Sequence, residues 1–244
     1  RMPNHTYNEY QIRKDEPVNA RYYYRTNGLV NLDKSNMPSY QPEAYQKPGC
    51  PIIVDLNGDG QITVEDVDMK NVIPSLYWGL GNTFTYKNWD LDVFIYSQLG
   101  VDKYNDVYSW TSGRGLGNQT NNMSVYIKDV WHSELNPNGT IPGIAYEMAS
   151  VSLPGGAGTD IGYENSSFVR VRNITLGYNF KPNQLGTLSK LLSGIRVYVD
   201  VQNPFTFTGY TGLDPEVNTG GNYKGGKAEY PQPRTFSLGA KLSF

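Results

Sequence analysis

The sequence has one cysteine, two histidines and no long hydrophobic run, and each shortage excludes a class of structure. A single thiol, Cys50, cannot form an internal disulfide, and no metal-ligating residues surround it in the sequence. His5 and His132 stand far apart and indicate surface or loop positions. No segment approaches the ~20 consecutive apolar residues of a membrane helix, although this does not exclude a membrane barrel, whose strands give a weaker signal.

Charge and catalytic motifs are also sparse. The net charge is −2, and no run of lysine and arginine indicates a nucleic-acid surface. No nucleophile stands beside an activating base, so we expect no catalytic residues and no enzyme. The chain begins Arg1-Met-Pro-Asn4 without the basic and apolar regions of an export signal, which indicates a fragment of a longer protein.

Alternation of apolar and polar residues is the main signal that is present. A weak strand is expected at 4–13, and strong alternation predicts five more strands. They are 76–86, 90–99, 166–180, 194–207 and 234–244. In the last of them Phe236, Leu238 and Ala240 share one side, and Ser237 and Gly239 lie on the other. Each such strand has one face that needs an apolar partner.

The segment 166–180 changes phase part-way along. Val169 and Val171 have the opposite parity from Ile174 and Leu176. A β-bulge near Asn173 would restore one continuous apolar face, and the alternative is that the upper part of the strand lies outside the lipid zone of a membrane barrel.

The connections between these strands alternate in length. They are long at 14–73, short at 87–89, long at 102–165, moderate at 181–193 and long at 208–232. Alternate connections of an antiparallel meander emerge at the same edge, so all long loops fall at one end. Outer-membrane barrels pair short periplasmic turns with long external loops. We therefore predict an all-β fold, an antiparallel transmembrane β-barrel portion of about six strands that needs further strands to close.

One motif carries ligand chemistry. Positions one, three, five and twelve of a twelve-residue loop are Asp55, Asn57, Asp59 and Asp66, with Gly60 at six. This is the ligand order of a calcium loop, in which the carbonyl oxygen of Gln61 is a further ligand and Thr63 acts directly or through water. A bare Asx-Gly turn that uses the same residues is the alternative. In either case these residues hold the loop in one conformation.

Several motifs together resemble the carboxyl-terminal part of SusC/RagA-type TonB-dependent outer-membrane transporters of the Bacteroidetes. They are Lys47-Pro-Gly49, Asp55-Leu-Asn-Gly-Asp-Gly60, Tyr86-Lys-Asn-Trp-Asp-Leu91, Phe168-Val-Arg-Val-Arg-Asn-Ile-Thr-Leu-Gly-Tyr178, Arg196-Val-Tyr-Val199, Asp214-Pro-Glu216 and Arg234-Thr-Phe-Ser237. One departure is Cys50-Pro51, where the family more often has an acidic residue.

The resemblance implies that 1–244 belongs to a roughly 22-stranded barrel, without its plug domain and signal peptide. It implies import of nutrients, commonly oligosaccharides and sometimes peptides, with a SusD-like surface lipoprotein as lid and the TonB complex as energy source. The long loops would face outward and contact substrate. The aromatic residues expected to stack on it are Trp110, Trp131, Tyr210 and Tyr223. The terminal Phe244 resembles the signal read by the barrel-assembly machinery, and the apolar strand faces would meet outer-membrane lipid.

A secreted, calcium-stabilised β-sandwich that binds glycans or a protein is the alternative from another class. It would need a second calcium repeat or apolar faces that pair internally. Neither is visible in the sequence.

Overall fold

The computed structural model describes residues 21–105, 108, 111, 123–143, 153–154, 158–217 and 230–244, so the expected strand at 4–13 lies outside it. The chain divides into two compact units. The loop unit consists of Arg1–Ile73, Val101–Asn165 and Thr219–Ala228, and the sheet unit consists of Pro74–Gly100, Ser166–Asn218 and Glu229–Phe244. In the described part of the chain, no helix has the length and apolarity to cross a membrane.

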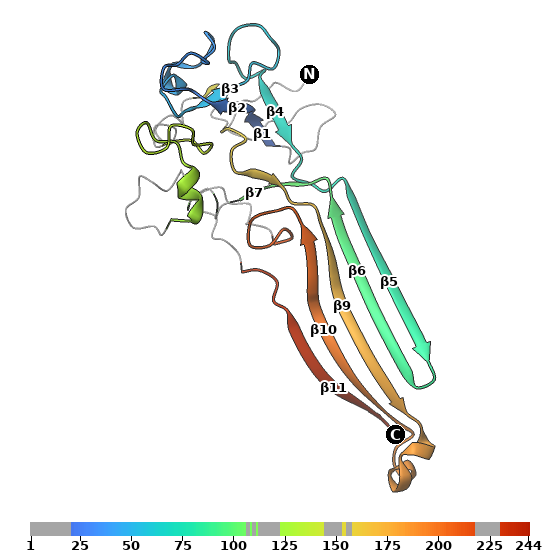
Figure 1. Ribbon diagram of the computed structural model, residues 1–244. Coiled ribbons are helices and arrows are strands. Elements are labelled where there is room, and N and C mark those ends of the chain that lie inside the picture. The colour runs from blue at the N-terminus through green and yellow to red at the C-terminus, as the bar shows by residue number, and fades with distance from the viewer. Residues whose placement is uncertain are drawn as a thin grey trace, which may run out of the picture. The chain divides into compact units, whose positions relative to one another are not determined.

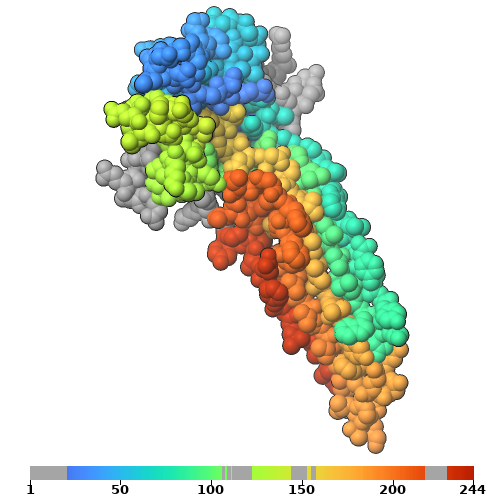
Figure 2. Space-filling model, in the orientation of Figure 1, coloured from blue at the N-terminus to red at the C-terminus, as the bar shows by residue number. Residues whose placement is uncertain are grey.

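The sheet unit is one antiparallel sheet of five long strands in the order β11-β10-β9-β6-β5 (Figure 1). The strands are β5 (Leu76–Tyr86), β6 (Trp89–Leu99), β9 (Phe168–Phe180), β10 (Gly194–Thr208) and β11 (Thr235–Ser243). Figure 2 shows them packed side by side. All five strong strand predictions are confirmed, with ends within two residues of the expected ones.

Short connections gather at one end of this sheet. Tyr86 pairs with Trp89, which leaves Lys87 and Asn88 as a two-residue turn, and Lys87 has a φ of 55°. The β9–β10 connection contains two 3-10 turns, η4 (Pro182–Gln184) and η5 (Gly186–Lys190). Figure 1 places both connections and the carboxyl terminus at the same end. The three long segments leave the sheet at its other end, as the alternation of loop lengths predicts.

The sheet has one apolar face that continues across its strands. Leu91 pairs with Leu176, Leu176 with Val199, and Val199 with Leu238. The large apolar residues on this face remain open to the surroundings, among them Leu80, Phe84, Leu176, Val199, Phe205, Phe207, Phe236, Leu238 and Leu242. No second sheet packs on this face among the described residues of the sheet unit. A β-sandwich would need one.

Two irregularities keep the apolar face continuous. Asn173 pairs with Phe94, and Val171 pairs with the next residue, Ile95, so β9 has one extra residue relative to β6. This confirms the bulge expected near Asn173. A second irregularity, in β10, was not expected: Gln202 pairs with Asn173 but Phe205 with Val171. Between them Asn203 has a φ of 49°, a left-handed conformation that asparagine tolerates better than most residues.

The loop unit has short strands of its own, although the sequence predicts irregular loops at 14–73 and 102–165. The antiparallel pairs are β1 (Arg21–Tyr24) with β4 (Val67–Lys70), β2 (Thr26–Leu29) with β3 (Pro51–Ile53), and β7 (Asp102–Tyr104) with β8 (Tyr163–Asn165). The described part of the unit also contains the 3-10 turns η1 (Glu43–Tyr45) and η2 (Val125–Asp129). Strands of three or four residues are too short to show alternation, which is why the sequence does not reveal them.

A small core stabilises the loop unit. Its buried members are Tyr22, Tyr24, Tyr45, Cys50, Ile53, Val67 and Leu153. The one thiol is therefore a core side chain, and burial raises the pKa of Cys50 to about 11. A thiol that stays protonated near neutral pH is a poor nucleophile.

Candidate functional site

In the calcium-type loop, residues 55–66, side-chain oxygens accept hydrogen bonds from the backbone of the same loop. The two oxygens of the Asp55 carboxylate accept hydrogen bonds from the backbone N–H of Gly58 at 2.7 Å and Gly60 at 2.8 Å. Asn57 Oδ1 accepts from the Asp59 N–H at 2.9 Å, and Asp59 Oδ1 accepts from the Gln61 N–H at 2.8 Å. These are Asx-turn contacts.

Asp66, the twelfth residue of the loop, closes it from inside and is fully buried. Its Oδ1 accepts from the N–H of Leu56 at 3.0 Å and of Asn57 at 3.3 Å, and its Oδ2 accepts from the Thr63 N–H at 2.7 Å. Burial alone would raise the pKa of Asp66, but these hydrogen bonds outweigh it and hold the pKa below its ordinary value. Asp66 therefore joins the start of the loop to its end as an anion.

The donor set of the loop has the hard oxygens that calcium prefers, but the arrangement is that of the Asx turn. In the described ranges, no three acidic, histidine or cysteine side chains converge as a metal-binding group. The oxygens of Asp55 and Asp66 accept hydrogen bonds from the backbone of their own loop. Both interpretations of the motif use the same residues, so calcium remains a prediction.

The four expected substrate-contact aromatics fall in different places. Trp110 and Tyr223 lie outside the described residues. Trp131 is half-buried, and its ring lies so close to Gly49 that a Cβ on this glycine would collide with it, whereas a Cβ on Gly143 would meet the carbonyl oxygen of Trp131 at 2.9 Å. Tyr210 is 8% exposed. Trp131 belongs to the loop unit and Tyr210 to the sheet unit, and the contact of both with substrate stays a prediction.

Phe244 lies at the end of the sheet that carries the short turns, and 82% of it is exposed. Its carbonyl oxygen accepts from the Ser193 hydroxyl, and the Ser193 N–H donates to the Ser243 carbonyl. The backbone of the terminus is thus paired with the start of β10, and the terminal ring is left free.

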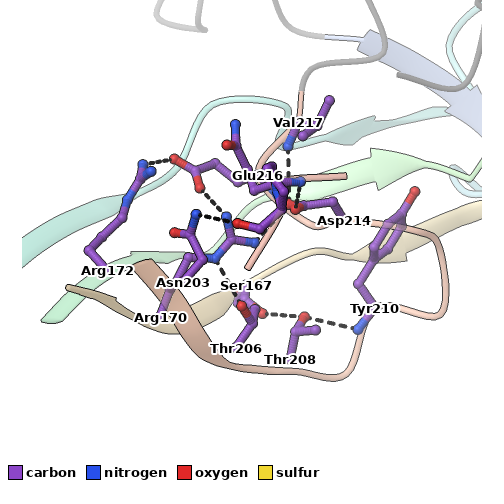
Figure 3. Close-up of polar contacts among 12 residues, drawn as sticks. Ser167, Arg170, Arg172, Asn203, Thr206, Thr208, Tyr210, Asp214, Glu216 and Val217 are labelled. Carbon is purple, nitrogen blue, oxygen red and sulfur yellow. Dashed lines mark hydrogen bonds and ion pairs between the residues drawn. The ribbon is translucent and has the colours of Figure 1, made fainter. Parts of the chain in front are cut away.

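The polar face of the sheet carries ion pairs that the sequence does not reveal. Arg196 on β10 pairs with Asp90 on β6, which also accepts from the side chain of Asn179 at 2.5 Å. Near the other end, Arg170 pairs with Asp214 at 2.9 Å and with Glu216 at 2.6 Å (Figure 3). Two features of the sequence point to this second cluster. Alternation places Arg170 on the polar face of its strand, and Asp214-Pro-Glu216 carries two acidic residues close together.

Asp214 lies in the loop that follows β10 and stays ionised. Burial would raise the pKa of Asp214, but hydrogen bonds from the Gln232 and Glu216 N–H groups and from Arg170 outweigh it, so the pKa lies below its ordinary value. The cluster of Arg170, Arg172, Asp214 and Glu216 therefore pairs two basic with two acidic side chains.

Comparison with known proteins identifies relatives over most of the chain. TonB-dependent receptor SusC of Bacteroides thetaiotaomicron is 34% identical over 208 residues, which cover 83% of this chain and 19% of SusC. TonB-dependent receptor P3 of Formosa agariphila is 28% identical over 242 residues, covering 96% of this chain and 23% of the relative. No protein-family model matches the chain.

Solved structures share the fold. The RagAB peptide importer in its "closed-closed" state superposes with a TM-score of 0.63 at 22% identity, covering 92% of this chain and 23% of that one. The "open-open" state gives the same TM-score at 24% identity. The chain belongs to the SusC/RagA-type TonB-dependent receptors.

As a SusC/RagA-type receptor segment, the chain is part of an outer-membrane β-barrel. It spans about a fifth to a quarter of the length of its curated relatives. In a barrel of this kind the outward face meets lipid and the lumen side is polar. The continuous apolar face of the sheet unit is then the lipid-facing side, and the ion pairs of Asp90 and Arg170 lie on the lumen side.

Proposed function

We propose that this chain is part of a TonB-dependent importer that carries a nutrient, an oligosaccharide or a peptide, across the outer membrane. In this proposal a SusD-like surface lipoprotein acts as lid, and the TonB complex supplies energy. The observation that carries it is the two-faced sheet of five strands, apolar on one side and polar on the other, with all long segments at one end. Its relatives are named TonB-dependent receptors, which are not enzymes.

Two observations bear on the substrate class. One similar structure is a peptide importer, which favours a peptide. The loops also contain Trp131 and Tyr210, and aromatic rings with neighbouring hydrogen-bonding groups suit sugars as well. The substrate test therefore needs one arm for each class.

The test uses the full-length receptor in its own host. We expect deletion of the gene to abolish uptake of either a labelled six-unit glucose oligomer or a labelled ten-residue peptide, and loss of the TonB complex to have the same effect. Restoring the gene should restore uptake. Unchanged uptake of both probes and unchanged growth on polysaccharide or protein as sole carbon source would argue against an import function.

We further propose that the loop 55–66 binds a structural calcium ion through Asp55, Asn57, Asp59, the Gln61 carbonyl and Asp66. The spacing of these oxygens supports it, and so do the positive φ angles of Gly58 and Gly60, which let the loop turn tightly. Binding would require the Asp66 carboxylate to exchange backbone partners for the ion.

For this cation site, Asp55→Ala or Asp59→Ala should remove stoichiometric calcium from the purified full-length receptor and loosen residues 50–70. Elemental analysis measures the metal, and hydrogen exchange measures the loop. Asp33→Ala, which removes an exposed carboxylate of the same unit, is the matched control. Absence of stoichiometric metal from the unmutated receptor leaves the Asx turn as the whole role of the motif.

We also propose that Phe244 is read by the barrel-assembly machinery. Its ring is exposed at the end of the last strand, where another protein can reach it. Deleting Phe244 should lower the amount of receptor inserted into the outer membrane several-fold, whereas transport per inserted molecule should change little. Quantitative immunoblots of membrane fractions measure insertion, and deletion of the neighbouring-turn residue Leu188 is the control. Equal membrane levels with and without Phe244 would contradict the proposal.

A further inference from the structure

The segment between β10 and β11 is held at both ends by one carboxylate. Oδ1 of Asp214 accepts from the backbone N–H of Glu216 at 2.8 Å, within the first part of the segment. Oδ2 of Asp214 accepts from the N–H of Gln232 at 2.9 Å, within the last part. Residues 214 and 232 are far apart in sequence, so this carboxylate closes the base of the segment as a ring.

Arg170 joins that closed base to the strands. Its Nε donates to the Thr206 hydroxyl on β10 at 2.9 Å, its Nη1 to Glu216 at 2.6 Å and its Nη2 to Asp214 at 2.9 Å (Figure 3). The side chain is only 2% exposed. Every nitrogen of the guanidinium thus donates to a partner, and two of the three partners belong to the segment.

Further contacts surround the ion pair of Arg170 and Asp214. Arg172 binds the second oxygen of Glu216, and the Asn203 side chain at the β10 bulge donates to the Pro233 carbonyl at 3.1 Å. The bulge that keeps the apolar face continuous therefore also aims Asn203 at the returning part of the segment. The contacts come from β9, from β10 and from both ends of the segment.

The pairing of strands in a β-barrel does not require a buried cluster of ion pairs. Burying ionised groups has a large desolvation cost, and buried ion pairs contribute less to stability than well-packed apolar side chains of similar size. What a planar guanidinium with fixed donors provides is a defined direction for each partner. This geometry is suited to holding a segment in one position.

We propose that Arg170 and Asp214 are positioning residues that fix the two described ends of the segment between β10 and β11, 209–217 and 230–234, on the lumen side of the barrel wall, and that substrate binding depends on the position of these ends. The link to substrate rests on the import function proposed above. The segment leaves the sheet at the end that carries all the long connections, where a substrate arriving from outside would first be bound.

The variants are made in the full-length receptor. Asp214→Asn keeps the shape of the side chain but replaces one acceptor oxygen by a donor, so it can no longer serve both Arg170 and Gln232. Arg170→Met keeps much of the side-chain volume and removes every donor. Asp90→Asn is the matched control, because Asp90 forms the Arg196 ion pair on the same face of the sheet and accepts from Asn179, and both of these partners lie on strands and not in the described ends of the segment, 209–217 and 230–234.

Three readouts separate positioning from folding. Heat-modifiable mobility reports barrel assembly, hydrogen exchange reports the amides of Glu216, Val217 and Gln232, and fluorescence reports binding of the labelled glucose oligomer and the labelled peptide. In Asp214→Asn and Arg170→Met we expect normal assembly, exchange at Gln232 at least tenfold faster and a Kd for the bound probe at least fivefold higher. Asp90→Asn should leave all three at wild-type values.

Two results would overturn the proposal. One is unchanged exchange at Gln232 or an unchanged Kd in both variants. The other is failure of both variants to assemble while Asp90→Asn assembles, because the cluster would then be a folding element. If the unmutated receptor binds neither probe, the proposed import function loses its support, and the exchange data alone then decide whether Arg170 and Asp214 fix the segment.

Discussion

Replacement of Leu238 by lysine is expected to cost about 2–4 kcal/mol of barrel stability, the penalty for a cation near the middle of a lipid-facing strand. Leu238 lies mid-way along β11, pairs with Val199 on β10 and is 78% exposed on the apolar face. A loss of this size is a large part of the stability of most folded domains. In the full-length receptor we expect the heat-modifiable form to fall several-fold in outer-membrane fractions.

The neighbouring residue supplies the control at the same depth. Ser237 lies on the opposite face of β11 and pairs with Asp200, so a lysine there faces the lumen next to a carboxylate. Ser237→Lys should leave assembly within about 0.5 kcal/mol of wild type, the usual range for surface changes. If Ser237→Lys were as damaging as Leu238→Lys, the assignment of the lipid-facing side would be wrong.

The second large effect is expected at Asp66. Asp66→Ala leaves the N–H groups of Leu56, Asn57 and Thr63 without their acceptor. Each lost bond to a charged acceptor is worth about 1.5–3 kcal/mol, and partial access to water reduces the sum, so we expect a local loss of about 3 kcal/mol. Hydrogen exchange across residues 52–68, measured in the presence of a chelator, would show it.

Asp59→Ala distinguishes calcium binding from closure of the loop by hydrogen bonds. The Asp59 side chain is exposed, and among backbone groups its carboxylate accepts from the Gln61 N–H. With chelator present, Asp59→Ala should accelerate exchange far less than Asp66→Ala. If the ion binds, added calcium should slow exchange in the unmutated receptor but in neither variant, because each variant lacks a ligand. Equal effects in chelator would show that Asp66 has no special role in closing the loop.

The strands were predictable because alternation is a local property. In an extended chain, successive side chains point to opposite faces, so the two-faced character of 76–86 follows from its own residues. The bulge near Asn173 was predictable for the same reason, since the phase change is visible within one strand. The bulge at Asn203 was not, because it compensates for an irregularity in a different strand.

The loop unit and the ion-pair cluster were not predictable from local patterns. Strands such as β1 and β3 have only three or four residues, and they are stabilised by a shared core of side chains distant in sequence. Arg170 and Asp214 are separated by 44 residues, and only the pairing of β9 with β10 brings them together. No local sequence pattern indicates that these two residues are neighbours in space.

The sequence by itself determined that this protein has long two-faced strands, short connections at one end of them and a twelve-residue loop with side-chain oxygens at the spacing of a calcium loop. These features depend on residue order within a strand or a turn, where covalent geometry sets which side chains share a face. Only the tertiary structure decided where the carboxylates point. In the folded protein Asp66 accepts hydrogen bonds from the backbone of its own loop, and Asp214 pairs with Arg170 at the base of the segment between β10 and β11. Hydrogen bonds and burial depend on which groups are neighbours in space, and the fold sets this.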